Sequence, residues 1–174
     1  MNEVTIGIKR LYDDVELPER GSVSAAGYDL RCHSIDVDDI KFTSHTSLLN
    51  RVRKSVADPS MEVIQIFPGE TAKIHTGLAV EIPEGYFGGI YARSGFATKQ
   101  GMRPANCVGV IDSDYRGEIV VAIHNDGNDP VIVNKGDRVA QLVIQPYLPV
   151  NFEVKDELSD TVRGEGGFGS TGKN

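Results

Sequence analysis

Alternating apolar and polar residues dominate the chain and predict β-strands. Near its beginning, Val4, Ile6 and Ile8 alternate with Thr, Gly and Lys, as expected of a half-buried strand. Short runs rich in Val and Ile follow, separated by brief stretches of Gly, Pro, Asn and Asp that favour turns. The runs that we assign to strands are 63–67, 71–75, 78–82, 107–111, 118–123, 131–133 and 138–144. Many short strands at this spacing are typical of an all-β sandwich or jelly roll.

Two segments depart from the β pattern. Apolar residues recur at helical spacing before Pro59, which predicts a helix containing Leu48, Leu49, Val52 and Val56. The tail loses apolar periodicity after about residue 156, and five glycines fall within the nine residues 164–172. Such a tail is flexible when nothing is bound to it. We therefore expect a β domain over residues 1–156 and a glycine-rich C-terminal arm over residues 157–174.

Composition and charge narrow the class of protein. The chain has 174 residues, of which 40% are hydrophobic and 25% charged, as expected of one globular domain. Its formal net charge of -7 opposes long contacts with a nucleic-acid backbone. No apolar run approaches the roughly 20 residues that cross a bilayer, and the first residues are unlike a signal peptide. We therefore expect a cytoplasmic protein with no nucleic-acid or membrane partner.

The cysteines and histidines do not point to a metal or a disulfide. Cys32 and Cys107 lie far apart in the sequence, and neither belongs to a CxxC pair. We expect both to be small buried residues. The four histidines show no spacing typical of paired zinc ligands. The sequence therefore predicts no zinc site.

Three segments carry groups suited to binding phosphate or activating water, although each also has a structural interpretation. The tail can present backbone N–H groups and polar side chains to phosphate oxygens through Arg163, Ser170 and Thr171. Residues 91–101 offer an arginine fork, a hydroxyl and room for close approach in Arg93, Ser94 and Gly95. Residues 109–118 place Asp112, Asp114 and Tyr115 in a turn. Taken singly, the tail is more typical of a plain linker, and the carboxylates of the third segment are typical of a turn. The second segment is equally compatible with an ordinary strand-to-helix connection.

Together with two further segments, these three segments form five ordered motifs that resemble those of the trimeric dUTPase family, and the resemblance covers essentially the whole chain. The motifs are AAGYDL (25–30), ARSGFATKQG (92–101), GVIDSDYRGE (109–118), GDRVAQL (136–142) and RGEGGFGSTG (163–172). The resemblance implies a jelly-roll-like subunit with one short helix. It also implies hydrolysis of dUTP to dUMP and pyrophosphate, which limits uracil in DNA and supplies dUMP for dTMP synthesis. The implied enzyme is a homotrimer whose sites take motifs one, two and four from one subunit, motif three from the next and motif five from the third.

The resemblance also implies roles for individual residues. Asp112 resembles the general base that deprotonates the attacking water, and Asp29 resembles the residue that binds Mg²⁺ through water. The residues similar to the family's phosphate-binding groups are Arg93, Ser94, Gly95, Gln141, Arg163, Ser170 and Thr171. Those similar to its uracil- and deoxyribose-binding groups are Asn106, Gly109, Val110, Ile111, Tyr115 and Phe168. By contrast, Asp137 and Arg138 suit a structural role, paired with each other or with the backbone.

One span is longer than the resemblance leads us to expect. The span between Asp29 and Pro68 is about two dozen residues longer than the usual short loop of the family. We assign the extra length to an insert of about residues 36–62, which holds the predicted helix. This insert is either a surface elaboration or a site for a protein partner with a regulatory role. Two other functions stay open, a dCTP deaminase and a non-enzymatic binding protein on the same fold. The intact Asp112, Tyr115 and glycine-rich tail favour dUTP hydrolysis.

Overall fold

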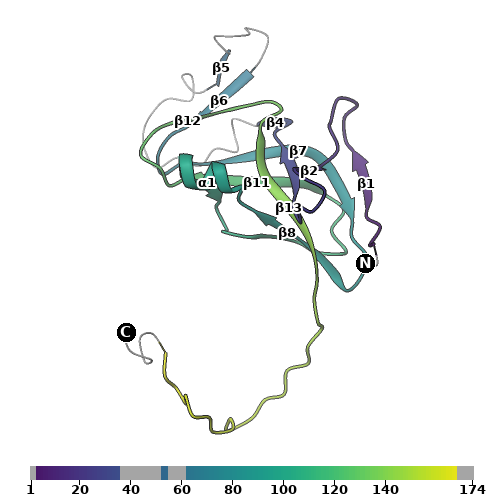
Figure 1. Ribbon diagram of the computed structural model, residues 1–174, viewed down its shortest axis with the longest axis vertical. Helices are drawn as coiled ribbons and strands as arrows, with labels where there is room; N and C mark the ends of the chain where they lie inside the picture. Colours follow the sequence, from purple (N-terminus) through teal and green to yellow (C-terminus); the bar gives the residue numbers. More distant parts are fainter. Residues whose placement is uncertain (1–2, 36–51, 55–61, 168–174) are drawn as a thin grey trace.

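A computed structural model describes residues 3–35, 52–54 and 62–167 of the chain, and this part is mainly antiparallel β-sheet (Figure 1). One sheet has the order β1-β7-β11-β9, with β4 also paired to β7. Its strands are β1 (Gly7–Arg10), β4 (Ser34–Ile35), β7 (Thr71–Glu81), β9 (Met102–Pro104) and β11 (Glu118–Asn125). The second sheet has the order β10-β8-β13-β3-β2. Its strands are β2 (Glu19–Arg20), β3 (Tyr28–Arg31), β8 (Tyr86–Tyr91), β10 (Gly109–Ile111) and β13 (Arg138–Pro146).

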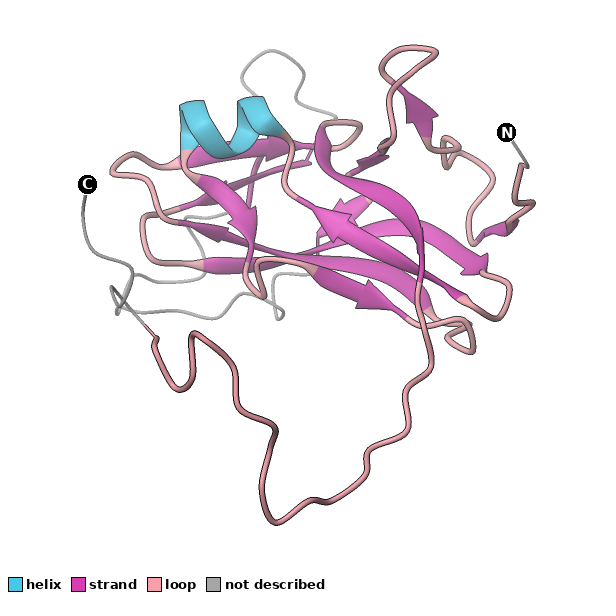
Figure 2. Cartoon of the chain, turned by 60° about the horizontal axis from the view of Figure 1, so that its bottom comes forward, coloured by secondary structure: helices cyan, strands magenta, loops and turns pink. Residues whose placement is uncertain are grey.

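A third, smaller sheet and one helix complete the described part. The small sheet consists of β5 (Val52–Lys54), β6 (Glu62–Ile66) and β12 (Val131–Asn134) in the order β12-β6-β5. The helix α1 (Ser94–Gln100) connects β8 to β9, and Figure 2 shows it as a short cyan coil at the edge of the strands. The all-β, jelly-roll-like fold with one short helix is confirmed.

Side chains from both large sheets share one hydrophobic core. Along β11 the residues Ile119, Val121 and Ile123 are buried, whereas Val120 between them is exposed. The opposite sheet contributes buried residues such as Leu30 and Leu142 to the same cluster. This alternation follows from the period of two in a strand, and each buried aliphatic side chain contributes roughly 1.5–3 kcal/mol. The core therefore fixes the two sheets against each other and positions the loops at their ends.

Most predicted strands are present, with different ends. The runs 71–75 and 78–82 form the single strand β7, which Gly77 continues at a φ of 69°. The predicted strand 107–111 begins only at Gly109, because Cys107 lies in a turn with a φ of 63°. Residues of β1 are exposed along its whole length, so the half-buried character expected at the start of the chain is wrong for β1 in the isolated subunit.

Two other expectations are wrong. The predicted helix containing Leu48, Leu49, Val52 and Val56 is contradicted at Val52–Lys54, which is strand β5 and pairs with β6, Val52 opposite Ile64. The remaining residues of that predicted helix lie outside the described residues. Pairing with a neighbouring strand has overridden the helical spacing of the apolar residues. Cys32 is buried, as predicted, but Cys107 is exposed, because it lies in the turn before β10.

Beyond β13 the chain leaves the sheets. Residues 147–167 form no helix or strand and run as a long, almost wholly exposed segment (Figures 1 and 2). No helix among the described residues is long and apolar enough to cross a membrane.

Candidate active site

Strand pairing brings residues of three sequence motifs into one row. On the second sheet, Gln141 of β13 lies opposite Asp29 of β3 on one side and opposite Tyr91 of β8 on the other. Arg93 follows β8 after one residue and occupies the N-cap position of α1, with no side-chain capping hydrogen bond. The first, second and fourth motifs therefore meet at one point of the sheet.

At this point two arginines surround one carboxylate. Arg93 Nε donates to Asp29 Oδ1 at 2.7 Å, and Arg138 Nη1 donates to Asp29 Oδ2 at 3.1 Å. The Asp29 side chain is only 14% exposed, so these ion pairs are partly shielded from water. Gln141 Nε2 donates to the carbonyl oxygen of Ala92 at 2.9 Å, which ties the fourth motif to the second. Two cations around one anion leave a local positive charge that suits a phosphate group.

The position of Arg138 differs from the expectation of a purely local role. Its neighbour Asp137 is structural, since Asp137 Oδ2 accepts hydrogen bonds from the backbone and side-chain nitrogens of Asn134 at 2.8 and 2.9 Å. Arg138 instead forms an ion pair with Asp29, the same carboxylate that pairs with Arg93. The sequence contained no sign of this contact, because it depends on how β13 is aligned with β3.

The first turn of α1 presents small, accessible residues beside this cluster. Ser94 and Gly95 are exposed, and no heavy atom lies within 4 Å of the position that a Cβ of Gly95 would take. Amide groups in the first turn of a helix have no partner within the helix. The helix ends at Gly101, whose φ of 70° and N–H bond to the carbonyl oxygen of Ala97 return the chain into β9. These features leave room for the oxygens of an anion close to Arg93.

The turn from β9 to β10 carries the residues predicted to bind uracil. Gly109 pairs opposite Ile90, and a Cβ at Gly109 would lie 3.5 Å from Asn106 Nδ2. Asn106 and Val110 are exposed, whereas Gly109 and Ile111 are partly buried. The structure therefore brings Asn106, in the turn, close to Gly109, Val110 and Ile111 on the edge strand β10.

The loop after β10 holds Asp112 and Tyr115 in a compact turn. The backbone N–H of Tyr115 donates to the carbonyl oxygen of Asp112 at 3.2 Å, and Tyr115 Oη donates to the carbonyl oxygen of Glu118 at 2.9 Å. Gly117 makes room for the ring, because a Cβ there would lie 2.4 Å from Tyr115 Oη. Both Asp112 and Tyr115 are exposed, so they can contact a bound molecule.

Asp112 lies far from the Asp29 cluster within one chain. Ile111 lies on β10, three strands from β3 in the sheet, and pairs with Gly88, three residues from Tyr91. Asp112 lies one residue farther from Tyr91 along this direction. With a strand spacing of about 4.8 Å and a rise of about 3.3 Å per residue, Asp112 and Asp29 are roughly 19 Å apart. A pocket of about 1130 Å³ borders Asp112 but contains no residue of the first, second or fourth motif. Its other lining residues include Thr5, Glu81, Phe87, Arg116 and Tyr147, which sequence reasoning did not identify.

The C-terminal arm contributes one described residue of the predicted site. Arg163 Nε donates to the carbonyl oxygen of Gly166 at 2.8 Å, and its side chain is exposed. Phe168, Ser170 and Thr171 lie outside the described residues. The arm therefore meets neither Asp29 nor Asp112 in any contact of the described chain.

Comparisons with known proteins identify the family of the chain. The family model for dUTPase matches residues 59–172. The deoxyuridine 5'-triphosphate nucleotidohydrolase of Desulfitobacterium hafniense is 41% identical over 99% of both chains. The corresponding protein of Bdellovibrio bacteriovorus is 40% identical, also over 99% of both chains. Because these alignments span nearly both whole chains, residues 36–62 are not extra length relative to these two proteins, and an insert is not confirmed.

A solved structure shares the whole fold. It is a variant of the Staphylococcus bacteriophage 80alpha dUTPase with dUpNHpp, which superposes with a TM-score of 0.73 at 27% identity. The match covers 97% of this chain and 99% of that one. The chain therefore belongs to the dUTPase family and is an enzyme of the dUTP nucleotidohydrolase class.

Proposed function

We propose that the enzyme hydrolyses dUTP to dUMP and pyrophosphate by attack of water on the α-phosphorus. The observation that carries this proposal is the convergence of Arg93, Arg138 and the exposed first turn of α1 around Asp29. Two guanidinium groups and free amide groups suit a triphosphate better than a neutral ligand. Ser94, Gly95 and Gln141 lie beside them and bind the phosphate chain.

Asp112 is the general base in this proposal. Its exposed carboxylate accepts a proton from water, the water oxygen forms a bond to the α-phosphorus, and pyrophosphate leaves with the electrons of the broken P–O bond. The hydrogen bond from the N–H of Tyr115 to the carbonyl oxygen of Asp112 fixes the turn that holds the base. Such positioning supplies much of the rate enhancement in a hydrolysis of this kind.

The turn before β10 selects the base and the sugar. Asn106 and the backbone of Gly109, Val110 and Ile111 offer donors and acceptors to the edge of uracil. Tyr115 supplies a flat ring for the deoxyribose, and a 2'-hydroxyl would collide with it.

We further propose a homotrimer with shared sites. The estimated separation of roughly 19 Å between Asp29 and Asp112 is too large for both to act on one reacting phosphate from the same chain. A neighbouring subunit therefore supplies the third motif. Residues 157–167 of the arm are almost wholly exposed and belong to no strand, and in this proposal the arm of residues 157–174 reaches a site on another subunit. Arg163, Ser170 and Thr171 then close over the γ-phosphate, and Phe168 stacks on uracil.

Mg²⁺ fits this site as a metal that the substrate brings with it. Among the described residues, no three His, Cys, Asp or Glu side chains form a group that could hold a metal ion. Asp29 would hold the ion through water, since lone pairs of its carboxylate not used by Arg93 and Arg138 can accept hydrogen bonds from metal-bound water. Mg²⁺ suits such a site because it commonly keeps several of its waters. When bound, the ion neutralises charge on the triphosphate.

The dUMP product serves dTMP synthesis, and removal of dUTP limits uracil in DNA; both uses fit an enzyme in the cytoplasm. A protein-binding role of residues 36–62 stays a prediction, because the structure describes only Val52–Lys54 and Glu62 of that span.

Pyrophosphate release from dUTP with Mg²⁺, measured beside dCTP, dTTP and UTP, tests the proposed reaction. We expect release from dUTP alone, and about 10³-fold or greater loss of kcat in Asp112→Asn with dUTP binding retained. Ammonia release from dCTP would instead identify a deaminase. Full turnover by Asp112→Asn would contradict the role of this carboxylate, and no turnover by a folded trimer would favour a binding protein.

A further inference from the structure

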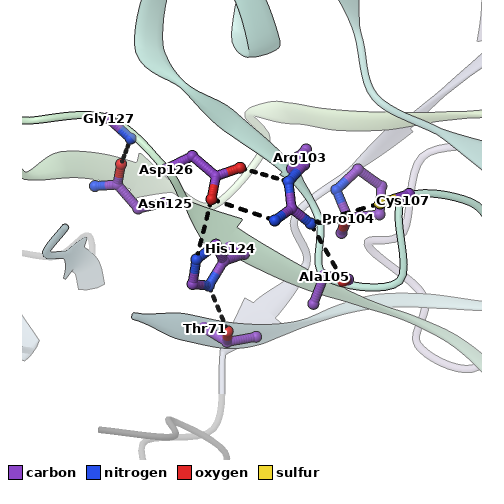
Figure 3. Close-up of polar contacts among 9 residues, drawn as sticks. All are labelled: Thr71, Arg103, Pro104, Ala105, Cys107, His124, Asn125, Asp126 and Gly127. Carbon is purple, nitrogen blue, oxygen red and sulfur yellow. Dashed lines mark hydrogen bonds and ion pairs between the residues drawn. The ribbon is translucent and has the colours of Figure 1, made fainter. Parts of the chain in front are cut away.

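A row of polar side chains, linked by hydrogen bonds and ion pairs, runs from β7 across β11 to the turn from β9 to β10 (Figure 3). His124 of β11 is opposite Arg103 of β9 on one side and opposite Thr71 of β7 on the other. Thr71 Oγ1 and His124 Nδ1 are 2.9 Å apart, and His124 Nε2 lies 3.3 Å from Asp126 Oδ1. None of these residues has a role in the hydrolysis proposed above.

Arg103 joins this row to the turn itself. Its Nε and Nη2 donate to the two carboxylate oxygens of Asp126, the second at 3.2 Å. Its Nη1 donates to the carbonyl oxygens of Pro104 and Ala105 at 3.1 and 3.2 Å and lies 3.8 Å from Cys107 Sγ. The planar guanidinium thus binds the carboxylate with one edge and the turn with its third nitrogen (Figure 3).

Asp126 is itself held in place by the backbone. Its N–H donates to the carbonyl oxygen of Gly101 at 2.9 Å. The preceding Asn125 is fully buried, and its Nδ2 donates to the carbonyl oxygens of Ile66 and Asp129 at 2.9 and 3.0 Å. Arg103 is therefore paired with a residue whose backbone is held in place and whose side chain is 46% exposed.

The backbone of the turn has a conformation that needs contacts from neighbouring side chains to hold it. Cys107, at a φ of 63°, is the sole non-glycine residue with positive φ in the described part of the chain. The N–H of Val108 donates to the carbonyl oxygen of Asn106 at 2.7 Å across it, which gives the rare and strained form of three-residue turn. Strain of this kind persists only where neighbouring groups hold the backbone.

We propose that Arg103 is a positioning residue for base recognition. It bonds the residues on both sides of Asn106, so the turn keeps the one geometry in which Asn106 and the amide groups leading to β10 face uracil together. This inference rests on the proposed uracil-binding role of Asn106 and β10. Arg103 itself does not touch the substrate; it acts through the carbonyl groups of Pro104 and Ala105.

The test compares Arg103→Met with the wild-type enzyme. Methionine keeps the aliphatic stem but removes every donor to the turn and to Asp126. We expect KM for dUTP to rise about 10-fold and kcat to change less than about 3-fold, because the Asp112 loop is untouched. The preference for dUTP over dTTP in kcat/KM should fall about 10-fold, since a relaxed turn admits the methyl group of thymine. The dissociation constant of dUMP, measured by calorimetry, should rise in parallel.

Further variants separate positioning from folding. Lys135→Met removes a cation whose ion pair, within the described part of the chain, is with Asp14 and not with a residue of the turn, so it should leave KM and the nucleotide preference unchanged. Arg103→Lys keeps the charge and one donor, so it should restore part of the preference. If Arg103→Met fails to fold, Asp126→Asn tests the same anchor with an isosteric side chain and should raise KM in the same direction.

The outcomes distinguish this inference from the proposed function. Wild-type turnover of dUTP, together with unchanged KM, nucleotide preference and dUMP affinity in folded Arg103→Met and Asp126→Asn, would overturn the positioning role alone. Equal losses of kcat for all nucleotides would also overturn it, because they would indicate general damage to the site. Absence of dUTP turnover in the wild-type enzyme would count against the proposed function instead.

Discussion

At the scale of single residues, the two cysteines show how burial sets chemistry. Cys32 is only 2% exposed and follows β3, whereas Cys107 is exposed in the turn before β10. Burial, helped by the nearby charge of Asp137, raises the pKa of the Cys32 thiol from 9.0 to about 12. A thiolate is disfavoured where water cannot solvate it, so Cys32 stays protonated in the folded enzyme at physiological pH.

Folding stability should therefore fall above pH 9 through Cys32. The folded-state pKa is higher than that of the unfolded chain, so the contribution of this thiol is complete below pH 9 and is lost as pH rises towards 12. Between pH 8.5 and 10.5 the loss is on the order of 2 kcal/mol. Urea unfolding at both pH values, with Cys32→Ala as the control, should show a smaller loss in the variant. Equal losses in both proteins would mean that the thiol does not titrate in this way.

At the scale of elements, Gly77 adopts the positive φ that β7 needs at this position. It has a φ of 69°, and a Cβ there would lie 2.5 Å from Val15 Cγ2. Gly77→Ala should therefore lower the free energy of unfolding by about 2–4 kcal/mol. Gly85→Ala is a matched control, because Gly85 has a φ of 85° but no atom within 4 Å of its Cβ position. The control should lose only the backbone part, about 1–2 kcal/mol, in the same thermal unfolding experiment. Equal losses would show that the contact with Val15 is unimportant.

Strands could be predicted from the sequence where one face is buried and the other exposed. The pattern on β11 satisfies this condition, and its prediction is confirmed within two residues. β8 was not predicted, because its middle residues are Gly88 and Gly89, which carry no side chain to show a period of two. The glycines are required by packing: a Cβ at Gly88 would lie 2.8 Å from Leu142 Cδ1 on β13. The requirement is visible only once the strands are paired.

The candidate site was predictable motif by motif, but the contacts between motifs were not. Resemblance to a family identified Asp29, Arg93 and Gln141 individually, and the pairing of β3, β13 and β8 brings them together. Arg138 was missed, because its contact with Asp29 depends on a register shift between Arg138 and Ala140. Such a shift has no local signal, since register is set by the whole sheet.

At the scale of the whole molecule, the separation of Asp29 from Asp112 has a consequence for assembly. If each site takes Asp29 from one subunit and Asp112 from the next, the Asp29→Asn and Asp112→Asn homotrimers are both inactive. A mixed trimer, however, contains intact sites wherever a subunit with a native Asp29 precedes one with a native Asp112. In a cyclic trimer mixed at random in equal amounts, each site has about one chance in four of being intact.

Co-refolding the two variants should therefore restore about a quarter of the wild-type kcat per site. The measurement is pyrophosphate release from dUTP, after tagged and untagged subunits have been shown by affinity capture to share trimers. Wild-type protein taken through the same refolding sets the full value, and each variant refolded alone sets the background. If verified mixed trimers stay at background, the two carboxylates serve one site within a single chain, and a conformational change must close the distance between β3 and the loop after β10.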